Sequence, residues 1–394
     1  MAHVMIAGGG IGGLAAAVGL AHQGHRITVL ERRDAFTELG AGIQLAPNAF
    51  HALDQLGIGD AVRARAVFID ELRLMDGTND EPIQVLPLTD SYRKRFGNPY
   101  TVLHRHDLYQ PLLDACRALN SQIRLCVDAT VESYLQSDGQ VTALLASRDR
   151  ITADALVGAD GIQSAVRRAL VGDGGPRVSG HTIYRALVPM KVVPSDLRTN
   201  AVTLWAGPRW HVVHYPISSG RVLNLAAVRD DGAAEAVAGA SVGDQEVLHA
   251  FPTMSKTPAR LLRLGQDWKK WVLCDRDPVC TWVDGRVALL GDAAHPMLQY
   301  AAQGACMALE DAALLGSLFD IDAEGIPDRF AAYNARRRDR TAKAQWLARH
   351  MGTHVYHPAG AQAEDRTAML SALSVAELYD KVTWLHGARD FTRT

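Results

Sequence analysis

The sequence predicts an α/β protein that consists of a parallel-sheet unit, a β-rich unit and a helical C-terminal region. Residues 3–7 form a short apolar segment that runs into a glycine cluster at 8–13 and then into an alanine-rich helical segment at 14–23. Between about 178 and 270, apolar and polar residues alternate as they do in half-buried antiparallel strands. After about 320 the chain is polar and has helical spacing. The strand–turn–helix order and the later change of period predict this architecture.

Composition excludes several classes of protein. The 394-residue chain carries 41 Lys and Arg residues against 43 Asp and Glu residues, a formal net charge of −2. Because nucleic acids and anionic membrane surfaces are bound by an excess of basic residues, neither is an expected partner. The apolar fraction of 48% argues against disorder, and at roughly 150 residues per domain the length predicts about two domains. The longest apolar segment, 11–21, is too short for the ~20 residues that cross a bilayer.

The cysteines predict neither a disulfide framework nor a metal site. Their number is odd, and their spacing contains no CxxC pair and no Cys/His zinc pattern. The five residues are Cys116, Cys126, Cys274, Cys280 and Cys306. The N-terminus has no charged region before an apolar stretch, so no signal sequence is expected. We therefore expect reduced thiols, a cytoplasmic protein and no bound metal.

The glycine cluster has the spacing of a dinucleotide-binding turn. Gly8, Gly10 and Gly13 meet its three requirements, which are a tight turn, close approach of the backbone to a pyrophosphate and close packing of the helix on the strand. The next apolar segment, 26–30, ends at Glu31, whose carboxylate can accept hydrogen bonds from a ribose 2′-hydroxyl. These features predict a Rossmann-like unit that binds a dinucleotide, and NAD and FAD share this turn.

Two later apolar segments end in motifs that extend this unit. One leads into Asp160 and Gly161 and then into a helix. The other leads into residues 291–296, which read Gly-Asp-Ala-Ala-His-Pro, and a helix follows Gly304. The free backbone N–H groups at that helix N-terminus can stabilise negative charge on a reduced flavin ring. In the segment 291–296, His295 is expected to make a structural hydrogen bond.

Together, these three motifs resemble the single-component FAD-dependent aromatic hydroxylases of the para-hydroxybenzoate hydroxylase type. They occur in the family's order and spread over roughly residues 3 to 320. Within the family the chain is most similar to the 6-hydroxylases of 3-hydroxybenzoate, which form gentisate. The 1-hydroxylases of salicylate and the 3-monooxygenases of 6-hydroxynicotinate are near relatives. The resemblance implies hydroxylation of a small phenolic acid through a flavin C4a-hydroperoxide, with FAD as cofactor, NAD(P)H and O2 as co-substrates, and a homodimer.

The resemblance also implies which residues hold FAD. Glu31 would bind the adenosine ribose, Arg105 the flavin side of the cofactor and Asp292 the ribityl and pyrophosphate region. The segment at Asp160 is associated with both FAD and NAD(P)H binding, and Gln44, Gly304 and Ala305 would lie near the flavin ring. The remaining cofactor candidates are the glycines of the turn and the residue after Glu31: Gly8, Gly10, Gly13 and Arg32. A structural role fits Gln44 equally well. Where many relatives have Asn, this chain has Cys306, for which we expect a small buried thiol without a redox role.

The β-rich unit supplies the candidate substrate pocket. In the predicted strand 211–215, His211 and Tyr215 share one face while His214 points to the other. A neutral histidine can accept the proton of a phenol, whose pKa is near 10, so His211 is the candidate base. By resemblance, Tyr215 would orient the substrate and Gln299 would hydrogen-bond its phenolic group. A purely structural His211 is the alternative, and Tyr184 and Arg185 are candidate supporting residues.

Two other classes of protein stay open at this point. One is an FAD-dependent dehydrogenase or reductase that does not activate oxygen, and the other is an NAD-dependent dehydrogenase that uses only the first glycine turn. The chain has no second GxGxxG, which favours transient docking of the reductant, and NADH is the expected reductant rather than NADPH.

The motifs predict a discontinuous domain organisation. The FAD-binding domain would comprise 1–70, 98–177 and 272–320, the substrate domain 71–97 and 178–271, and the helical region 321–394. In this last region the basic run 336–340 is expected on a solvated helix face. Trp384 and Leu385 are expected in an apolar patch that a monomer would have to cover.

Overall fold

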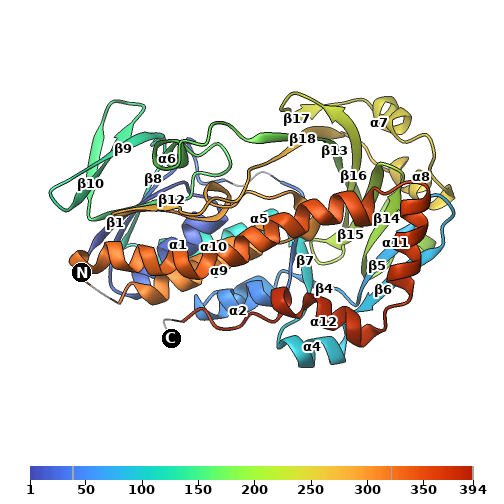
Figure 1. The fold of residues 1–394 in the computed structure, drawn as a ribbon, viewed down its shortest axis with the longest axis horizontal. Helices are drawn as coiled ribbons and strands as arrows, with labels where there is room; N and C mark the ends of the chain where they lie inside the picture. The colour runs from blue at the N-terminus through green and yellow to red at the C-terminus, as the bar shows by residue number, and fades with distance from the viewer. Residues whose placement is uncertain (38–39, 321, 393–394) are drawn as a thin grey trace.

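A six-stranded sheet forms the first layer of the protein, in a computed structural model that describes residues 1–37, 40–320 and 322–392 (Figure 1). All neighbouring strands are parallel except β19 and β20. The strand order is β19 (Val283–Asp284), β20 (Val287–Leu289), β12 (Ala155–Gly158), β1 (His3–Ala7), β2 (Arg26–Leu30) and β8 (Ile123–Cys126). The predicted Rossmann-like arrangement of strand, glycine turn and helix is confirmed, and the helix α1 (Ile11–His22) begins within the glycine cluster.

Helix α9 (Gly304–Leu318) packs closely along α1 because both helices have a glycine where they meet. A Cβ added to Gly316 would lie 2.9 Å from the backbone of Gly19, closer than real Cβ atoms come. Both helices are buried on almost every side, so their Ala- and Leu-rich sequences have no polar face. This packing fixes the position of the α9 N-terminus relative to the six-stranded sheet.

The second layer is an eight-stranded sheet in which strands far apart in the sequence are paired. Its order is β17 (Ala238–Ser241), β18 (Lys269–Asp275), β13 (Arg177–Pro189), β16 (Val222–Ala233), β15 (Trp210–Ile217), β14 (Ala201–Gly207), β5 (Glu71–Asp76) and β6 (Pro82–Pro87). The predicted hairpin at 218–220 joins β15 and β16, and Ser218, Ser219 and Gly220 all have positive φ. β14 and β15 are buried at every residue, so both faces of the sheet are covered there. The predicted domain boundaries stay a prediction.

Smaller elements connect and cover the two large sheets. The small sheets are β3 (Gly42–Leu45), β7 (Thr101–His104) and β4 (Val67–Phe68), and β11 (Arg150–Ala153), β10 (Gln140–Leu145) and β9 (Val131–Ser137). The helices before the C-terminal region are α2 (Pro47–Gln55), α3 (Gly59–Arg63), α4 (Asp90–Phe96), α5 (Arg105–Ala118), α6 (Ala165–Leu170), α7 (Asp244–Ala250) and α8 (Lys256–Leu262).

The C-terminal region is helical, as predicted. The long helix α10 (Ile326–His350) runs along the molecule from one sheet to the other (Figure 1). It continues into a π-helical turn, η6 (Met351–Tyr356), and is followed by α11 (Ala361–Ser371) and α12 (Val375–His386). Single π-helical turns often occur at functional sites.

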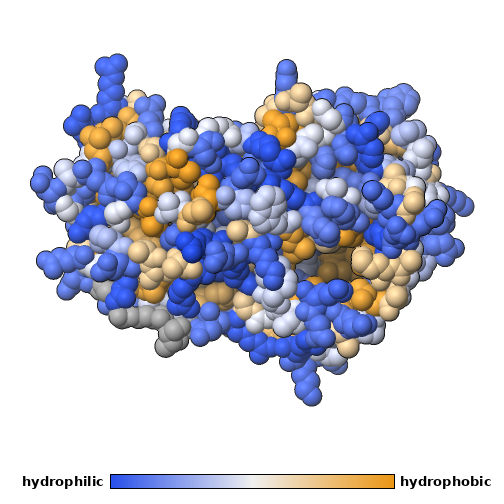
Figure 2. Space-filling view, in the orientation of Figure 1, coloured by the Kyte–Doolittle hydropathy of each residue, from blue (hydrophilic) through white to orange (hydrophobic). Residues whose placement is uncertain are grey.

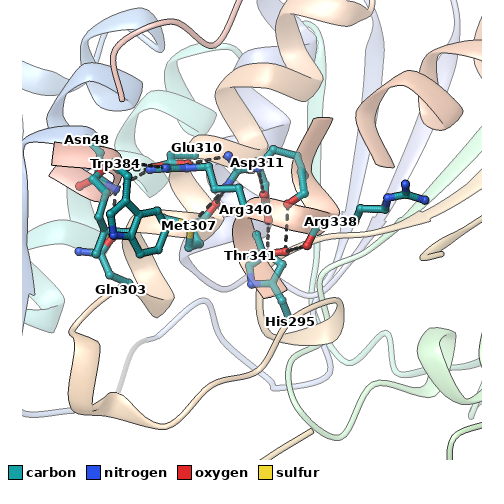
Figure 3. Close-up of polar contacts among 12 residues, drawn as sticks. Asn48, His295, Gln303, Met307, Glu310, Asp311, Arg338, Arg340, Thr341 and Trp384 are labelled. Atoms are coloured by element: carbon teal, nitrogen blue, oxygen red, sulfur yellow. Dashed lines mark hydrogen bonds and ion pairs between the residues drawn. The ribbon is translucent and has the colours of Figure 1, made fainter. Parts of the chain in front are cut away.

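The prediction that 336–340 lies on a solvated helix face is wrong for Arg337 and Arg340. Arg337 is 2% exposed and donates to Glu310 at 2.5 Å and to Asp311 at 2.7 Å, while Arg340 donates to Glu310 at 2.7 Å (Figure 3). Burial alone would raise the pKa of Asp311, but His295 and Arg337 lower it to about 2. The sequence does not indicate these ion pairs because the two carboxylates belong to α9 and the arginines to α10.

The expected apolar patch near the C-terminus is covered by the chain itself. Leu385 is 4% exposed, and Phe391 is also buried. The ammonium group of Lys343 lies 4.0 Å from the centre of the Trp384 ring, and Arg340 also lies over this ring. This patch therefore gives no reason to expect a dimer.

All five cysteines are free. Within the described residues, no helix combines the length and apolar character needed to cross a bilayer. The same part of the chain holds no group of three or more His, Cys, Asp or Glu side chains placed to bind a metal ion.

Acidification is expected to destabilise the fold through three buried histidines. Burial lowers the pKa of His214 to about 4 and the pKa values of His357 and His386 to about 3. Below pH 6.5 these histidines bind protons in the unfolded chain but stay neutral in the folded chain. Their contribution to the free energy of unfolding is therefore complete above pH 6.5 and is lost as the pH falls toward 4. Each histidine should lower the free energy of unfolding by about 1.4 kcal/mol per pH unit.

Thermal unfolding at pH 7.5, 6.0 and 5.0 measures this effect. The variant His386→Gln should show a shallower decrease in Tm than the wild type, whereas His249→Gln, at an exposed position, should follow the wild type. An unchanged Tm between pH 7.5 and 5.0 would contradict the expectation.

Candidate active site

The glycine turn after β1 leaves room for a phosphate group at one position and is tightly packed at another. A Cβ added to Gly13 would lie 2.0 Å from the carbonyl oxygen of Gly8, which itself has a φ of +107°. A Cβ added to Gly10 would meet no atom within 4 Å. The backbone N–H of Gly9 donates to Glu31 at 2.8 Å, so the predicted ribose ligand also fixes the turn. The open position at the N-terminus of α1 fits a pyrophosphate.

Replacing Gly10 by Val should separate cofactor binding from folding. Gly10 has a φ of −78°, which any residue can adopt, and its Cβ position is open, so the fold should tolerate the change. The added side chain would occupy the phosphate position and should weaken FAD binding by roughly 100-fold, about 2.7 kcal/mol.

Equilibrium FAD titration of the apoprotein measures this loss. The control is Gly175→Ala, because Gly175 also has open space around its Cβ position and lies outside the turn. Full FAD affinity in Gly10→Val would show that the cofactor lies elsewhere.

The other two motifs meet the site from the neighbouring strands. Asp160 accepts hydrogen bonds from Ser164 Oγ at 2.5 Å and from the backbone of Ala165 at 2.8 Å, so its carboxylate caps α6. Asp292 is exposed, and its Oδ1 lies 3.8 Å from the Cβ position of Gly304, at the start of α9. Ala305 is partly exposed beside it, and Arg32 is exposed at the end of β2. The structure therefore brings Asp292, Gly304 and Ala305 to one end of α9.

The buried ion network of Figure 3 holds this end of the site in place. Asp311 accepts a hydrogen bond from the backbone N–H of Gly291 at 3.0 Å and lies 2.5 Å from His295 Nε2. Asn48, in α2, donates to Gln303 at 3.0 Å and to Glu310 at 2.7 Å. His295 thus makes the expected structural contact, and the network links α2, α9 and α10 to the 291–296 loop.

Tyrosine and amide side chains line the boundary between the small sheet β3-β7-β4 and strand β15. Tyr100 donates to Gln44 at 2.7 Å, and Gln44 also contacts the hydroxyl of Tyr215. Burial raises the pKa of Tyr215 to about 12, so its hydroxyl stays protonated. A Cβ added to Gly42 would lie 2.5 Å from the Tyr215 ring, which shows how tightly β3 packs on β15. This position is compatible with both roles considered for Gln44, a place near the flavin and a purely structural one.

The guanidinium groups of Arg185 and Arg105 form a cationic edge beside this boundary. Arg185, in β13, donates to Gln299 Oε1 at 2.5 Å, and its guanidinium carbon lies 5.5 Å from the centre of the Trp271 ring. Burial lowers the pKa of Arg185, Tyr215 raises it and Arg105 lowers it further, yet an arginine stays charged. No carboxylate among the described residues pairs with Arg185. Two guanidinium groups near each other favour an anion at this edge.

His211 lies at the buried end of the same face of β15. It is 2% exposed, and its Nδ1 lies 2.7 Å from Nε2 of His357. The rings of Tyr300 and Tyr356 pack around it, with centroids 5.4 and 5.1 Å away. Burial, and to a lesser degree His357 and His181, lower the pKa of His211 well below its ordinary value. His211 is therefore a neutral imidazole. Along β15, Val213 and Tyr215 pack in one core cluster and Trp210 and Val212 in another, so His214 points to the face opposite His211, as predicted.

Cys306 is fully buried and donates to the backbone oxygen of Ala302 at 3.6 Å. Burial raises the pKa of its thiol to about 12, so the thiolate needed for redox chemistry does not form at neutral pH.

Figure 2 shows a hollow with apolar walls on the surface between α10 and α12.

Sequence patterns missed three residues of this site. Tyr100 and His357 come from segments with no motif, and Arg185 was expected only as a supporting residue. The one available signal was an arginine within an alternating strand, because arginine is seldom placed in a core without an anionic partner.

Comparison with known proteins places the chain in a family. Residues 1–347 match the family model described as FAD binding domain. The chain is 46% identical over 386 residues to 3-hydroxybenzoate 6-hydroxylase 1 of Aquipseudomonas alcaligenes, covering 98% of this chain and 97% of that protein. It is 41% identical over 394 residues to 3-hydroxybenzoate 6-hydroxylase of Klebsiella oxytoca, covering 99% and 98%.

The fold comparison agrees. A solved salicylate hydroxylase substrate complex has a TM-score of 0.84 and 27% identity, covering 99% of this chain and 96% of that one. The similarities in sequence and fold set aside the plain NAD-dependent dehydrogenase and the flavoprotein that does not activate oxygen. The chain belongs to the FAD-dependent aromatic hydroxylases, a family of flavoprotein monooxygenases.

Proposed function

We propose that the protein hydroxylates 3-hydroxybenzoate at carbon 6, with NADH as the preferred reductant, and forms gentisate. The observation that carries the substrate is the 46% identity over 98% of the chain to an enzyme named for this reaction. When bound, FAD takes electrons from NAD(P)H and delivers one oxygen atom of O2 to the aromatic ring. The glycine turn, Arg105, Asp292 and the N-terminus of α9 would hold the cofactor.

Proton removal from the substrate is the task of His211 in this proposal. The ring carbon attacks an electrophilic oxygen, and a phenolate is far more electron-rich than a phenol at the position para to its oxygen. A neutral imidazole with a free Nε2 lone pair can accept the phenolic proton, and the low pKa of His211 keeps it neutral. Gln299 gives its oxygen to Arg185, so its amide nitrogen is left to donate to the phenolate oxygen.

Arg185 supplies the positive charge that an acidic substrate needs. In the variant Arg185→Gln, the loss of charge-assisted hydrogen bonds of ~1.5–3 kcal/mol should raise the KM for 3-hydroxybenzoate by roughly 10- to 150-fold. Steady-state kinetics with 3-hydroxybenzamide, which lacks the carboxylate, provides the control and should show a much smaller change. An equal loss with both compounds would place Arg185 on the cofactor instead.

A substrate panel tests the proposed function. NADH and O2 consumption by the purified protein should be stimulated most by 3-hydroxybenzoate and less by salicylate, 6-hydroxynicotinate and 4-hydroxybenzoate. Stimulation by salicylate alone would favour the second candidate, a salicylate 1-hydroxylase, which the 27% identity to the solved salicylate hydroxylase supports. A basal rate that no compound changes would overturn the assignment of the pocket.

The proposal includes a cytoplasmic homodimer. The free cysteines support a reducing compartment, and the dimer rests on the resemblance to the family. Sedimentation equilibrium tests the dimer directly, and a monomer at micromolar concentration would contradict it.

A further inference from the structure

Gln299 lies in a tight turn whose backbone needs support from outside the turn. η4 (Gln299–Ala301) is a single 3₁₀ turn, and the residue that ends it, Ala302, has a φ of +51°. This left-handed conformation is unfavourable for a residue other than glycine and persists where the surrounding structure holds it. The direction of the Gln299 side chain therefore depends on the contacts that η4 makes.

Tyr300, the middle residue of η4, makes several of these contacts. It is 4% exposed, and its hydroxyl lies 2.5 Å from Nδ1 of His181 in β13. Its backbone oxygen accepts a hydrogen bond from the hydroxyl of Tyr356 at 3.1 Å. Its ring packs on Gly352, where an added Cβ would lie 2.6 Å away. Two separate elements, β13 and η6, therefore hold this one residue in place.

The hydrogen bond between Tyr300 and His181 has one direction. Burial lowers the pKa of His181 and raises the pKa of Tyr300 well above its ordinary value, so the imidazole is neutral and the hydroxyl keeps its proton. The hydroxyl thus donates to Nδ1, and Nε2 of His181 carries the histidine proton toward Asp230, whose Oδ1 lies 4.0 Å away. An irregularity in the pairing of β13 with β16 at Gly180, where φ is +81°, comes just before His181, and such bulges re-aim a side chain.

β13 holds the turn at two points. His181 and Arg185 are four residues apart on this strand, so they share one face and lie about 13 Å from each other. His181 contacts Tyr300, and Arg185 donates to Oε1 of Gln299 at 2.5 Å. Successive residues of a 3₁₀ turn point about 120° apart. Fixing the ring of Tyr300 therefore also fixes the direction in which the amide of Gln299 leaves the turn.

We propose that Tyr300 is a positioning residue for hydroxylation, and that its hydrogen bond to His181 directs the amide of Gln299 at the phenolic oxygen of the substrate. The inference rests on the proposed function. Without the hydroxyl, η4 loses its contact with His181, and the amide is free to turn away from the substrate. A hydrogen bond to a phenolate is stronger than one to a phenol, so a misaligned amide should make the bound substrate harder to ionise and should slow its hydroxylation.

The variant Tyr300→Phe removes the hydroxyl and keeps the ring. Titration of the FAD-loaded enzyme with 3-hydroxybenzoate at several pH values, followed by the absorbance of the phenolate, gives the pH at which the bound phenol ionises. In Tyr300→Phe this pH should be higher by about 0.5 or more, and kcat/KM should fall roughly three- to tenfold. In a Gln299→Leu background the same change should alter neither quantity further, because Tyr300 acts through the amide.

Two replacements of His181 test the other side of the hydrogen bond. His181→Leu removes the acceptor, so it should reproduce the losses of Tyr300→Phe and add nothing to them in the double variant. In His181→Asn the amide oxygen can take the place of Nδ1, so most of the loss should be rescued.

The matched control is Tyr379→Phe, which removes another buried hydroxyl, one that donates to the carbonyl of Pro87 at 2.9 Å. Its Tm should fall about as much as that of Tyr300→Phe, while the ionisation of the bound phenol and kcat/KM stay as in the wild type. FAD content and Tm verify that each variant is folded, and if Tyr300→Phe is not folded, the two His181 variants decide.

Equal effects of Tyr300→Phe in the wild-type and Gln299→Leu backgrounds, or equal losses in His181→Leu and His181→Asn, would overturn the positioning role while the hydroxylase stands. Unchanged ionisation and kcat/KM in folded Tyr300→Phe would do the same. A wild-type enzyme that neither ionises nor hydroxylates 3-hydroxybenzoate would overturn both proposals.

Discussion

Replacing His211 by Gln is expected to lower kcat for hydroxylation by ~10²- to 10⁴-fold while FAD stays bound. Of the two histidines in β15, His211 is the one that contacts a second imidazole, at 2.7 Å. Glutamine keeps a polar group of similar reach, so the packing of Tyr300 and Tyr356 should change little. The loss therefore measures the missing base rather than a collapsed site. Single-turnover formation of product, with the flavin spectrum recorded in parallel, is the appropriate measurement.

His214→Gln provides a matched control for this variant. His214 is buried on the same strand but faces the other side of the sheet, near Arg73. Its replacement should leave the rate of hydroxylation within about threefold of the wild type, well below the effect of a lost base. Equal rates in His211→Gln and wild type at pH 7 would remove His211 from the mechanism.

Replacing Arg337 by Met is expected to destabilise the protein by ~3–5 kcal/mol, because two buried carboxylates lose their shared partner. Arg337 donates to Glu310 and Asp311, both fully buried on α9. Asp311 in turn holds Gly291 and His295, so the loop that carries Asp292 should loosen as well. Chemical denaturation and the dissociation constant of FAD should both register the change.

The neighbouring variant Arg338→Met distinguishes the network from a general effect of lost charge. The Arg338 side chain is 45% exposed and pairs only with Asp339 among the described residues. Its replacement should change the free energy of unfolding by less than about 0.5 kcal/mol. If the two variants were equally stable, the buried network would carry no net energy.

Local sequence patterns predicted the parts of the fold that are contiguous in the chain. The turn at Gly8, Gly10 and Gly13, with its flanking strand and helix, is local: Gly8 has a positive φ, a Cβ at Gly13 would clash with the Gly8 carbonyl, and Gly10 leaves open space at the start of the helix. The hairpin at 218–220 was equally local. The pairing of β5 with β14 depends on contacts between residues about 130 positions apart, which no periodicity encodes. The burial of Arg337 was missed for the same reason, since its partners lie on another helix.

The residues of the candidate site also fall into those that local patterns predict and those that distant segments supply. His211, Tyr215 and Gln299 could be predicted because a strand period and a family motif point to them, whereas the position of His357 depends on how the chain turns after α10. Nothing in the segment 351–357 indicates a π-helical turn or a contact with β15. Tyr100 was missed because a tyrosine before a short strand is ordinary in a core. Residues that complete a site from distant segments become visible only in three dimensions.

The most direct test of the central claim is turnover of 3-hydroxybenzoate under ¹⁸O₂ with NADH, followed by mass analysis of the product. A flavoprotein monooxygenase that acts at carbon 6 should yield gentisate carrying one ¹⁸O atom per molecule, with one NADH consumed for each. Oxidation of NADH to give hydrogen peroxide without product, or a product that lacks the label, would contradict the account.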